Sequence, residues 1–169
     1  MAAPIRILVV GCGHMGTSHA KAYHALPEFE IVGVVSRGES SRRHLLSAIG
    51  ADYPQFGDFT EALAATKPDA VSINTYPDTH AAYAKQAFAA GCHVFLEKPV
   101  AVTVAEAEEV VRAAKSAGKK LVVGYILQVH PSWQLQVRCK RCRFRRTTLD
   151  VCCRSSENST HPHRKGQIT

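Results

Sequence analysis

The sequence predicts an α/β protein with a doubly wound parallel sheet of the Rossmann type. Short runs rich in valine, isoleucine and leucine alternate with helical segments of roughly 10–15 residues, which is typical of βαβ units. A G-x-G-x-x-G turn, with its glycines at Gly11, Gly13 and Gly16, follows the first apolar run and opens the first helical segment. Such units wind with right-handed crossovers into a parallel sheet that carries helices on both faces.

The strands are expected where short apolar runs stand between turn signals. Their richness in isoleucine and valine is typical of strands that are buried on both faces of a parallel sheet. The runs that meet this description are residues 5–10, 30–36, 70–74, 93–96 and 121–125.

The first two helices are bounded by residues that favour helix ends. The first helix is expected to run from the glycine turn to a point just before Pro27, because proline cannot continue a helix. Ser40 or Ser41 can cap the second helix, which is expected to end near Ile49 with Gly50 after it.

The later helices carry capping-box patterns and terminal glycines. Residues 58–61 and 103–106 each fit a capping box, in which an acceptor at the N-cap pairs with a glutamate three positions on. A helix is expected over residues 79–90, with Gly91 as its left-handed cap, and Gly118 is expected to end the last helix. The apolar face of that last helix, expected to be buried, consists of Val104, Ala107, Val110, Val111 and Ala114.

Charge divides the chain near residue 134. Nine of the 21 Lys and Arg residues, but only two of the 14 acidic residues, lie in 135–169, so the net charge of +7 belongs to that segment. Residues 1–134 are therefore neutral and offer no basic footprint for nucleic acid. No run of about 18 apolar residues occurs, so we expect no membrane span and a soluble cytoplasmic protein.

Residues 135–169 form a basic, cysteine-rich tail that leaves the alternating pattern. Its few apolar residues show neither the two-residue period of a strand nor the 3.6-residue period of a helix, so disorder is expected. A rival interpretation draws zinc ligands from Cys139, Cys142, Cys152, Cys153, His161 and His163. Their spacing fits no zinc-finger pattern, so no metal is expected. The arginines between 143 and 146 either bind nucleic acid or remain solvated.

The glycine-rich turn is the candidate cofactor site. Gly11 permits a tight turn, Gly13 lets the backbone approach a pyrophosphate, and Gly16 lets the helix pack close to the strand. The N-terminus of the helix offers unpaired amides and a partial positive charge to the diphosphate. His14 and Met15 lie within the turn, where they either contact cofactor or substrate or merely fill the turn.

The end of the second strand predicts NADP. An acidic residue about 20 positions after the glycines would bond the ribose of NAD, but Ser36 stands there, followed by Arg37. A serine does not repel a 2′-phosphate, and an arginine can pair with that phosphate and stack on adenine. Arg42 and Arg43 lie close by in the sequence. NAD is the alternative if Arg37 is only a solvated surface residue.

Two further segments carry a more specific pattern. They are residues 74–80, NTYPDTH, and residues 89–99, which end in Glu97, Lys98 and Pro99. Together with the glycine motif and residues 124–133, they resemble the glucose–fructose oxidoreductase/inositol dehydrogenase (Gfo/Idh/MocA) family over roughly residues 4–134. The resemblance implies an NAD(P)-dependent oxidoreductase that transfers hydride between nicotinamide and a hydroxyl of a sugar, polyol or related compound.

The resemblance also assigns residues to the site. It implies that Lys98 is catalytic and lies beside the nicotinamide and the substrate hydroxyl, where a lysine can bond the alcohol oxygen and help place its proton. It implies that a cis bond precedes Pro99, and it places Gln128 where relatives often have arginine. The positions that would line the nicotinamide half are Thr75, Tyr76, Pro77, His80, Glu97 and Pro99. On its own, His80 reads as an ordinary histidine at a helix start.

Members of this family continue into a second α/β domain, which supplies most of the substrate pocket and an acid/base pair. The present sequence leaves the family pattern near Gln134, and a frameshift or a mispredicted gene end is the expected reason. We therefore expect the chain to bind the dinucleotide without turnover. The alternatives are an active oxidoreductase and a non-catalytic NAD(P)-binding module or regulator, and the oligomeric state stays open.

Overall fold

The computed structural model describes residues 3–125. Several expectations fall outside these residues: the domain end at 134, the environment of Gln128, the disordered tail and the rival zinc ligands. None of the helices in the described part is long and apolar enough to cross a membrane.

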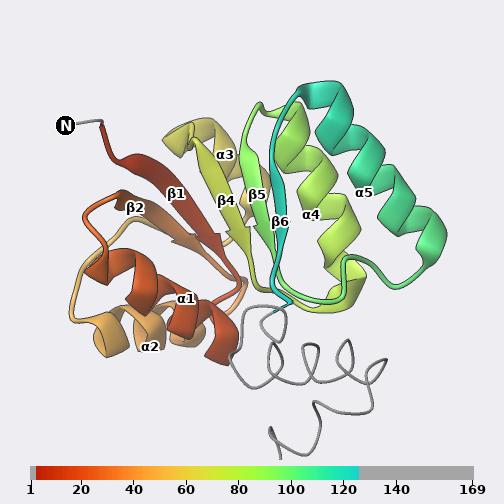
Figure 1. The fold of residues 1–169 in the computed structure, drawn as a ribbon. Helices are drawn as coiled ribbons and strands as arrows, with labels where there is room; N and C mark the ends of the chain where they lie inside the picture. Colours follow the sequence, from red (N-terminus) through yellow and green to blue (C-terminus); the bar gives the residue numbers. More distant parts are fainter. Residues whose placement is uncertain (1–2, 126–169) are drawn as a thin grey trace, which may run out of the picture. The chain divides into compact units, whose positions relative to one another are not determined.

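The sheet has six parallel strands in the order β3-β2-β1-β4-β5-β6, which confirms the predicted doubly wound architecture (Figure 1). The strand order reverses between β1 and β4, and ligands of open α/β sheets bind in the crevice at such a switch point. The strands are β1 (Ile5–Val10), β2 (Phe29–Val35), β3 (Gln55–Phe56), β4 (Ala70–Ile73), β5 (His93–Leu96) and β6 (Leu121–Val123).

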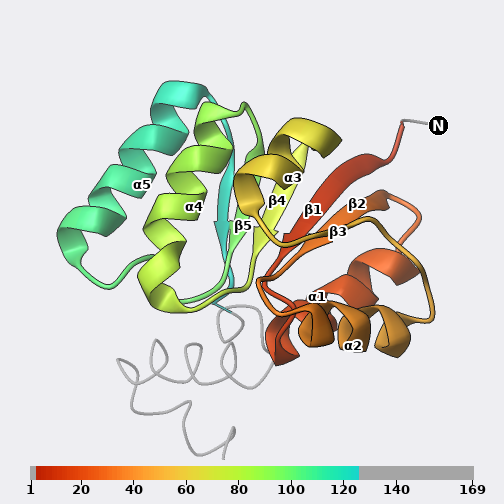
Figure 2. The same ribbon diagram turned by 180° about the vertical axis from the view of Figure 1, so that it is seen from behind.

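Helices cover the sheet from both sides (Figures 1 and 2). Two of them pack over one face and three over the other, and each group encloses its own cluster of buried apolar side chains. The first group is α1 (His14–Ala25) and α2 (Glu39–Ile49); the second is α3 (Phe59–Thr66), α4 (Pro77–Ala89) and α5 (Val104–Ala117).

Strand β1 shows how one apolar run serves both layers. Ile7 and Val9 join the cluster under α1 and α2, whereas Leu8 and Val10 join the cluster under α3, α4 and α5. All four are at most 2 % exposed, as expected for a central parallel strand whose side chains alternate between two covered faces.

Most predicted helix ends are confirmed. Thr103 and Glu106 form the complete capping box of α5. At α3 the Asp58 side chain accepts from the amide of Glu61 at 2.9 Å, and within the described part only this half of the predicted box forms. The three glycines expected after helices all adopt positive φ: Gly50, Gly91 and Gly118.

Two predicted helix starts are wrong. Gly38, rather than Ser40 or Ser41, is the N-cap of α2, since Glu39 already joins the first turn, where its charge complements the helix dipole. Helix α4 begins at Pro77 rather than at residue 79, because proline at the first helical position loses no hydrogen bond and already has a helical φ.

Two other expectations need correction. Val104 and Val111 of α5 are 77 % and 40 % exposed, because α5 meets its neighbours mainly through Val110 and Ala114. Strand β3 was not expected, since two residues are too few to show a period.

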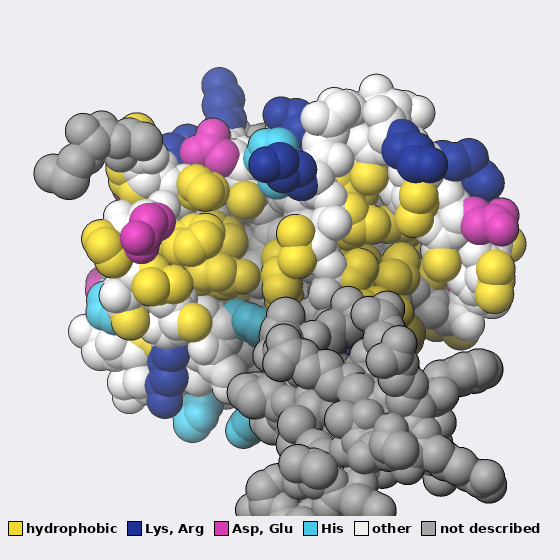
Figure 3. All heavy atoms as spheres, in the orientation of Figure 1, with side chains coloured by type: hydrophobic (Ala, Val, Ile, Leu, Met, Phe, Trp, Pro, Cys, Tyr) yellow, Lys and Arg dark blue, Asp and Glu magenta, His cyan; other side chains and the backbone are white. Residues whose placement is uncertain are grey.

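Val122 of β6 is 55 % exposed, and other hydrophobic side chains reach the surface on the face drawn in Figure 3.

Candidate functional site

The carboxyl ends of the strands are held side by side by backbone hydrogen bonds. After β1, β4, β5 and β6, the next residue donates its amide to the last carbonyl of a neighbouring strand, at 2.7–2.9 Å. The pairs are Gly11 to Val35, Asn74 to Val10, Glu97 to Ile73 and Gly124 to Leu96. This row, called here the carboxyl edge, brings together three segments that the sequence singled out: the glycine turn, residues 74–77 and residues 97–99.

The glycine turn is too tight for side chains at two of its positions. Gly11 has a φ of +93°, and a Cβ there would lie 2.6 Å from the carbonyl oxygen of Asn74. A Cβ on Gly16 would lie 1.7 Å from the carbonyl oxygen of Gly11. These contacts explain the tight turn and the close approach of α1 to β1, as predicted for the two glycines.

Gly13 is surrounded differently. No described atom lies within 4 Å of a Cβ placed on it, and its φ of −80° and ψ of −166° suit any residue. Gly13 caps α1 without a side-chain bond, and the first turn of α1 contains no acidic residue. Open space therefore adjoins Gly13 at the N-terminus of α1, where the first amides of a helix have no partner within the helix, and this arrangement fits a diphosphate.

A groove of about 680 Å³ extends from the glycine turn between α1 and α2. Its walls include Gly13 and His14 from the turn, Lys21 from α1, and Ser41 and His44 from α2. No carboxylate lines it, and Lys21 places a positive charge in the same groove as the open face of Gly13. Both residues inside the turn are exposed, His14 and Met15, the latter by 37 %.

The turn after β2 contains Ser36 and Arg37, and Arg42 folds back onto it. The guanidinium of Arg42 donates to the carbonyl oxygen of Ser36 and, at 3.3 Å, to that of Arg37, while its Nε is buried without a partner. Arg37 itself is exposed. Arg43 points elsewhere and pairs with Glu39 on the surface of α2.

Cys12 lies under the glycine turn, beside the end of β2. Its thiol is buried and donates to the carbonyl oxygen of Val35 at 3.5 Å. Burial raises the pKa of Cys12 to about 11, against a smaller opposing effect from the charge of Arg42. The thiol is therefore protonated at neutral pH and acts as a packing group.

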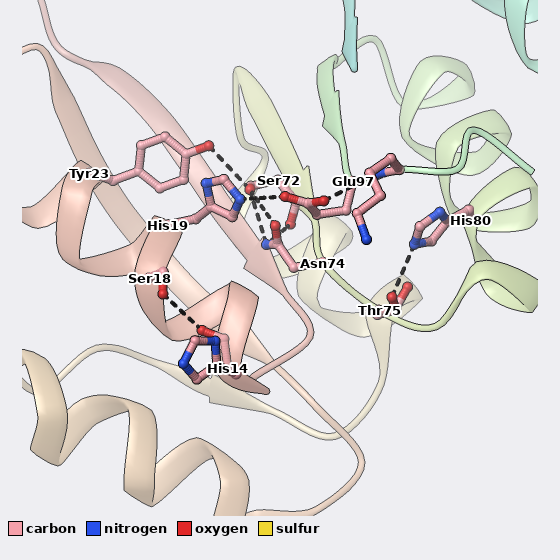
Figure 4. Close-up of polar contacts among 10 residues, drawn as sticks. His14, Ser18, His19, Tyr23, Ser72, Asn74, Thr75, His80 and Glu97 are labelled. Carbon is pink, nitrogen blue, oxygen red and sulfur yellow. Dashed lines mark hydrogen bonds and ion pairs between the residues drawn. The ribbon is translucent and has the colours of Figure 1, made fainter. Parts of the chain in front are cut away.

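The segment after β4 leads into α4 (Figure 4). Tyr76 caps α4 and is 78 % exposed. The hydroxyl of Thr79 donates to that of Thr75 at 2.7 Å. His80 is only 1 % exposed; its Nδ1 lies 2.7 Å from the carbonyl oxygen of Pro99 and its Nε2 lies 3.0 Å from that of Thr75. His80 is thus a buried bridge between two segments of the carboxyl edge.

The segment after β5 contains Glu97, Lys98 and Pro99. The Glu97 carboxylate is buried, with Oε1 2.8 Å from Nε2 of His19 and Oε2 accepting the amide of Lys98 at 3.1 Å. Lys98 is exposed at the edge, and the bond to Pro99 is cis, as the resemblance implied. A Cβ on Gly124 would lie 3.1 Å from the carboxylate, so this glycine leaves room for it.

A polar network beneath the edge escaped the sequence analysis. Tyr23 donates to the hydroxyl of Ser72 at 3.2 Å, and the amide of Asn74 donates to the carbonyl oxygen of Ser72 at 3.1 Å. Burial raises the pKa of Tyr23; its bond to Ser72 lowers it, and the charge of Glu97 raises it further.

The overlooked side chains had a recognisable signal on α1. His19 and Tyr23 are spaced by four positions and lie on the side of the helix that buries Gly16 and Ala20. Polar side chains on a helix face that is turned toward a sheet need partners there. The spacing therefore pointed to buried partners but did not identify them.

Comparison with known proteins agrees with this geometry. Residues 5–125 match the model of the Gfo/Idh/MocA family, described as an oxidoreductase family with an NAD-binding Rossmann fold. Inositol 2-dehydrogenase of Burkholderia cenocepacia is 34 % identical over 72 % of this chain and 37 % of its own. UDP-N-acetylglucosamine 3-dehydrogenase of Acidithiobacillus ferrooxidans is 35 % identical over 77 % of this chain and 40 % of its own.

A solved structure shows the same likeness. The WlbA dehydrogenase from Chromobacterium violaceum, in complex with NADH and UDP-GlcNAcA, superimposes with a TM-score of 0.76 and 28 % identity. The match covers 86 % of this chain and 42 % of the WlbA chain. The chain thus spans about two fifths of the length of the proteins that it matches.

Proposed function

This chain belongs to the Gfo/Idh/MocA oxidoreductase family, and we propose that it binds NAD(P) along the carboxyl edge. The observation that carries the proposal is the open face of Gly13, which contrasts with the crowded Gly11 and Gly16. A diphosphate at Gly13 would accept hydrogen bonds from the first amides of α1. His14 and Met15 flank that position in the turn.

The nicotinamide half of the cofactor is assigned to the other end of the edge. Thr75, Tyr76 and Pro77 would line it from the start of α4, and Glu97 and Pro99 would shape it from the loop after β5. When bound, the nicotinamide would supply the hydride chemistry of the reaction. Lys98 is the proposed catalytic residue: its exposed ammonium can bond the oxygen of a substrate hydroxyl and hold or return that proton.

We propose that NADP is preferred to NAD. Ser36 places no carboxylate where a 2′-phosphate would lie, and Arg37 is exposed and free to reach it. Arg42 braces the same turn through the carbonyl oxygens of Ser36 and Arg37. Calorimetric titration with both cofactors tests the preference, and Arg37→Ala should reduce it, with Arg43→Ala as a matched control. Tighter binding of NAD than of NADP would contradict it.

The proposed substrate is a sugar, a polyol or a related hydroxyl compound, since the relatives named above are dehydrogenases of an inositol and of a sugar nucleotide. A non-catalytic NAD(P)-binding module is the second candidate, because Lys98 is the one described residue to which a catalytic role is assigned. We expect the 169-residue chain to bind the dinucleotide without measurable turnover. Turnover that Lys98→Ala abolishes would favour the enzyme instead.

A further inference from the structure

Two histidines from separate helices contact the segment that carries Lys98. His19 of α1 reaches the Glu97 carboxylate at 2.8 Å, one residue before Lys98. His80 of α4 reaches the carbonyl oxygen of Pro99 at 2.7 Å, one residue after it. The side chain of Lys98 is exposed. The two histidines therefore act on its position through its neighbours, Glu97 and Pro99.

The contact on the Glu97 side is directional. A carboxylate only accepts hydrogen bonds, so Nε2 of His19 must carry the proton and donate it. The other carboxylate oxygen accepts the amide of Lys98 at 3.1 Å. The side chain of Glu97 therefore links His19 to the backbone of Lys98. Because this carboxylate is buried, losing His19 would leave one oxygen short of a partner, and the side chain would turn toward water.

The contact on the Pro99 side spans two loops. The ring nitrogens of His80 lie next to two carbonyl oxygens, that of Pro99 and that of Thr75 at 3.0 Å. His80 is fully enclosed, and water does not compete for these nitrogens. A carbonyl oxygen only accepts, so the nitrogen that carries the N–H makes the hydrogen bond, and the ring packs between the loop after β5 and the loop after β4.

We propose that His19 and His80 are positioning residues that clamp the Glu97–Pro99 segment from two sides and so fix where Lys98 stands. This inference deepens the proposed function and rests on it. Helix α1 carries both the glycine turn at its N-terminus and His19 one turn beyond Gly16. The clamp therefore connects the helix assigned to the diphosphate with the lysine assigned to the nicotinamide side.

The first test needs no nucleotide. Hydrogen exchange of the Lys98 amide, followed by NMR in the full chain, reports directly on its bond to Glu97. We expect His19→Ala and His80→Ala to accelerate that exchange by about tenfold, while amides in the middle of β1 stay unchanged. His19→Gln keeps an N–H donor and should restore slow exchange. His24→Ala, which removes an exposed histidine bonded to Tyr53, is the matched control.

The second test compares NADP with 2′-phospho-ADP-ribose, which lacks the nicotinamide. The clamp variants should lower the ratio of the two affinities and leave binding of the fragment within about twofold of wild type. If His80→Ala does not fold, His80→Gln takes its place. Unchanged Lys98 exchange, or equal loss of affinity for both nucleotides, would overturn the positioning role. Wild-type protein that binds neither nucleotide would refute the proposed function instead, and the exchange experiment would still decide the clamp.

Discussion

Substituting the glycines of the turn one at a time separates cofactor binding from folding. Gly13→Ser adds a side chain where no described atom lies within 4 Å, at a backbone conformation that any residue adopts. Serine is also a slightly better N-cap than glycine, by a few tenths of a kcal/mol. We therefore expect the free energy of unfolding without cofactor to be unchanged or marginally higher.

The same substitution should remove most of the affinity for the dinucleotide. A side chain at Gly13 would keep the diphosphate away from the first amides of α1. Each hydrogen bond from an amide to a charged oxygen contributes about 1.5–3 kcal/mol. Losing one of them lowers the affinity by roughly 10- to 150-fold, since about 1.4 kcal/mol corresponds to a factor of ten.

Gly16→Ala should instead lower the stability of the fold in the absence of nucleotide. Its Cβ would lie 1.7 Å from the Gly11 carbonyl oxygen, whereas side chains do not approach closer than 3.0 Å, so α1 would have to retreat by about 1.3 Å. Overpacking of this kind costs about 3 kcal/mol. For a chain of this size, that lowers the melting temperature by roughly 6–12 °C.

Thermal unfolding without nucleotide and calorimetric titration with NADP measure both quantities on the same samples. The reasoning fails if Gly13→Ser binds NADP as tightly as wild type, because the diphosphate would then lie elsewhere. It also fails if Gly16→Ala melts like wild type.

Three further outcomes follow from single contacts. Ser36→Asp should invert the cofactor preference measured by titration, because a carboxylate repels a 2′-phosphate and accepts from a ribose hydroxyl. Thr103→Ala should lower the free energy of unfolding, measured by urea titration, by about 1 kcal/mol, since it removes the capping box of α5. The pKa of Cys12 is raised from 9.0 to about 11, so the buried thiol favours folding below pH 9, and this contribution of about 2–3 kcal/mol is lost as pH rises from 9 to 11. The loss should be smaller in Cys12→Ser, measured by urea unfolding across that range, and an equal loss would contradict it.

The sheet and most helix ends could be predicted because their signals are local. Buried parallel strands are short apolar runs, and caps such as Thr103 with Glu106 lie within one helical turn. The N-cap of α2 was missed because Gly38 caps through backbone conformation, which leaves no side-chain pattern. Strand β3 was missed because pairing with β2 defines its two residues, and no local pattern does.

The candidate site could be outlined from the sequence only where a motif is contiguous. The glycine turn and Glu97-Lys98-Pro99 are contiguous, whereas the contact between His19 and Glu97 joins residues 78 positions apart. No local pattern gives that distance. Arg42 shows the same limit: it was noted only as a neighbour of Arg37 in sequence, yet the helical turn of α2 brings its guanidinium under the carbonyl oxygens of the turn.

The close packing of Gly16 also determines how His19 meets Glu97. Gly16 and His19 are three positions apart on α1, so they move together when the helix moves. A retreat of α1 by about 1.3 Å, as a Cβ on Gly16 would require, would stretch the 2.8 Å contact between His19 and Glu97 to about 4 Å. That distance is beyond hydrogen bonding, so the Lys98 amide would share its acceptor with water. The absence of a Cβ at Gly16 therefore governs both the approach of the diphosphate helix to the sheet and the placement of Lys98.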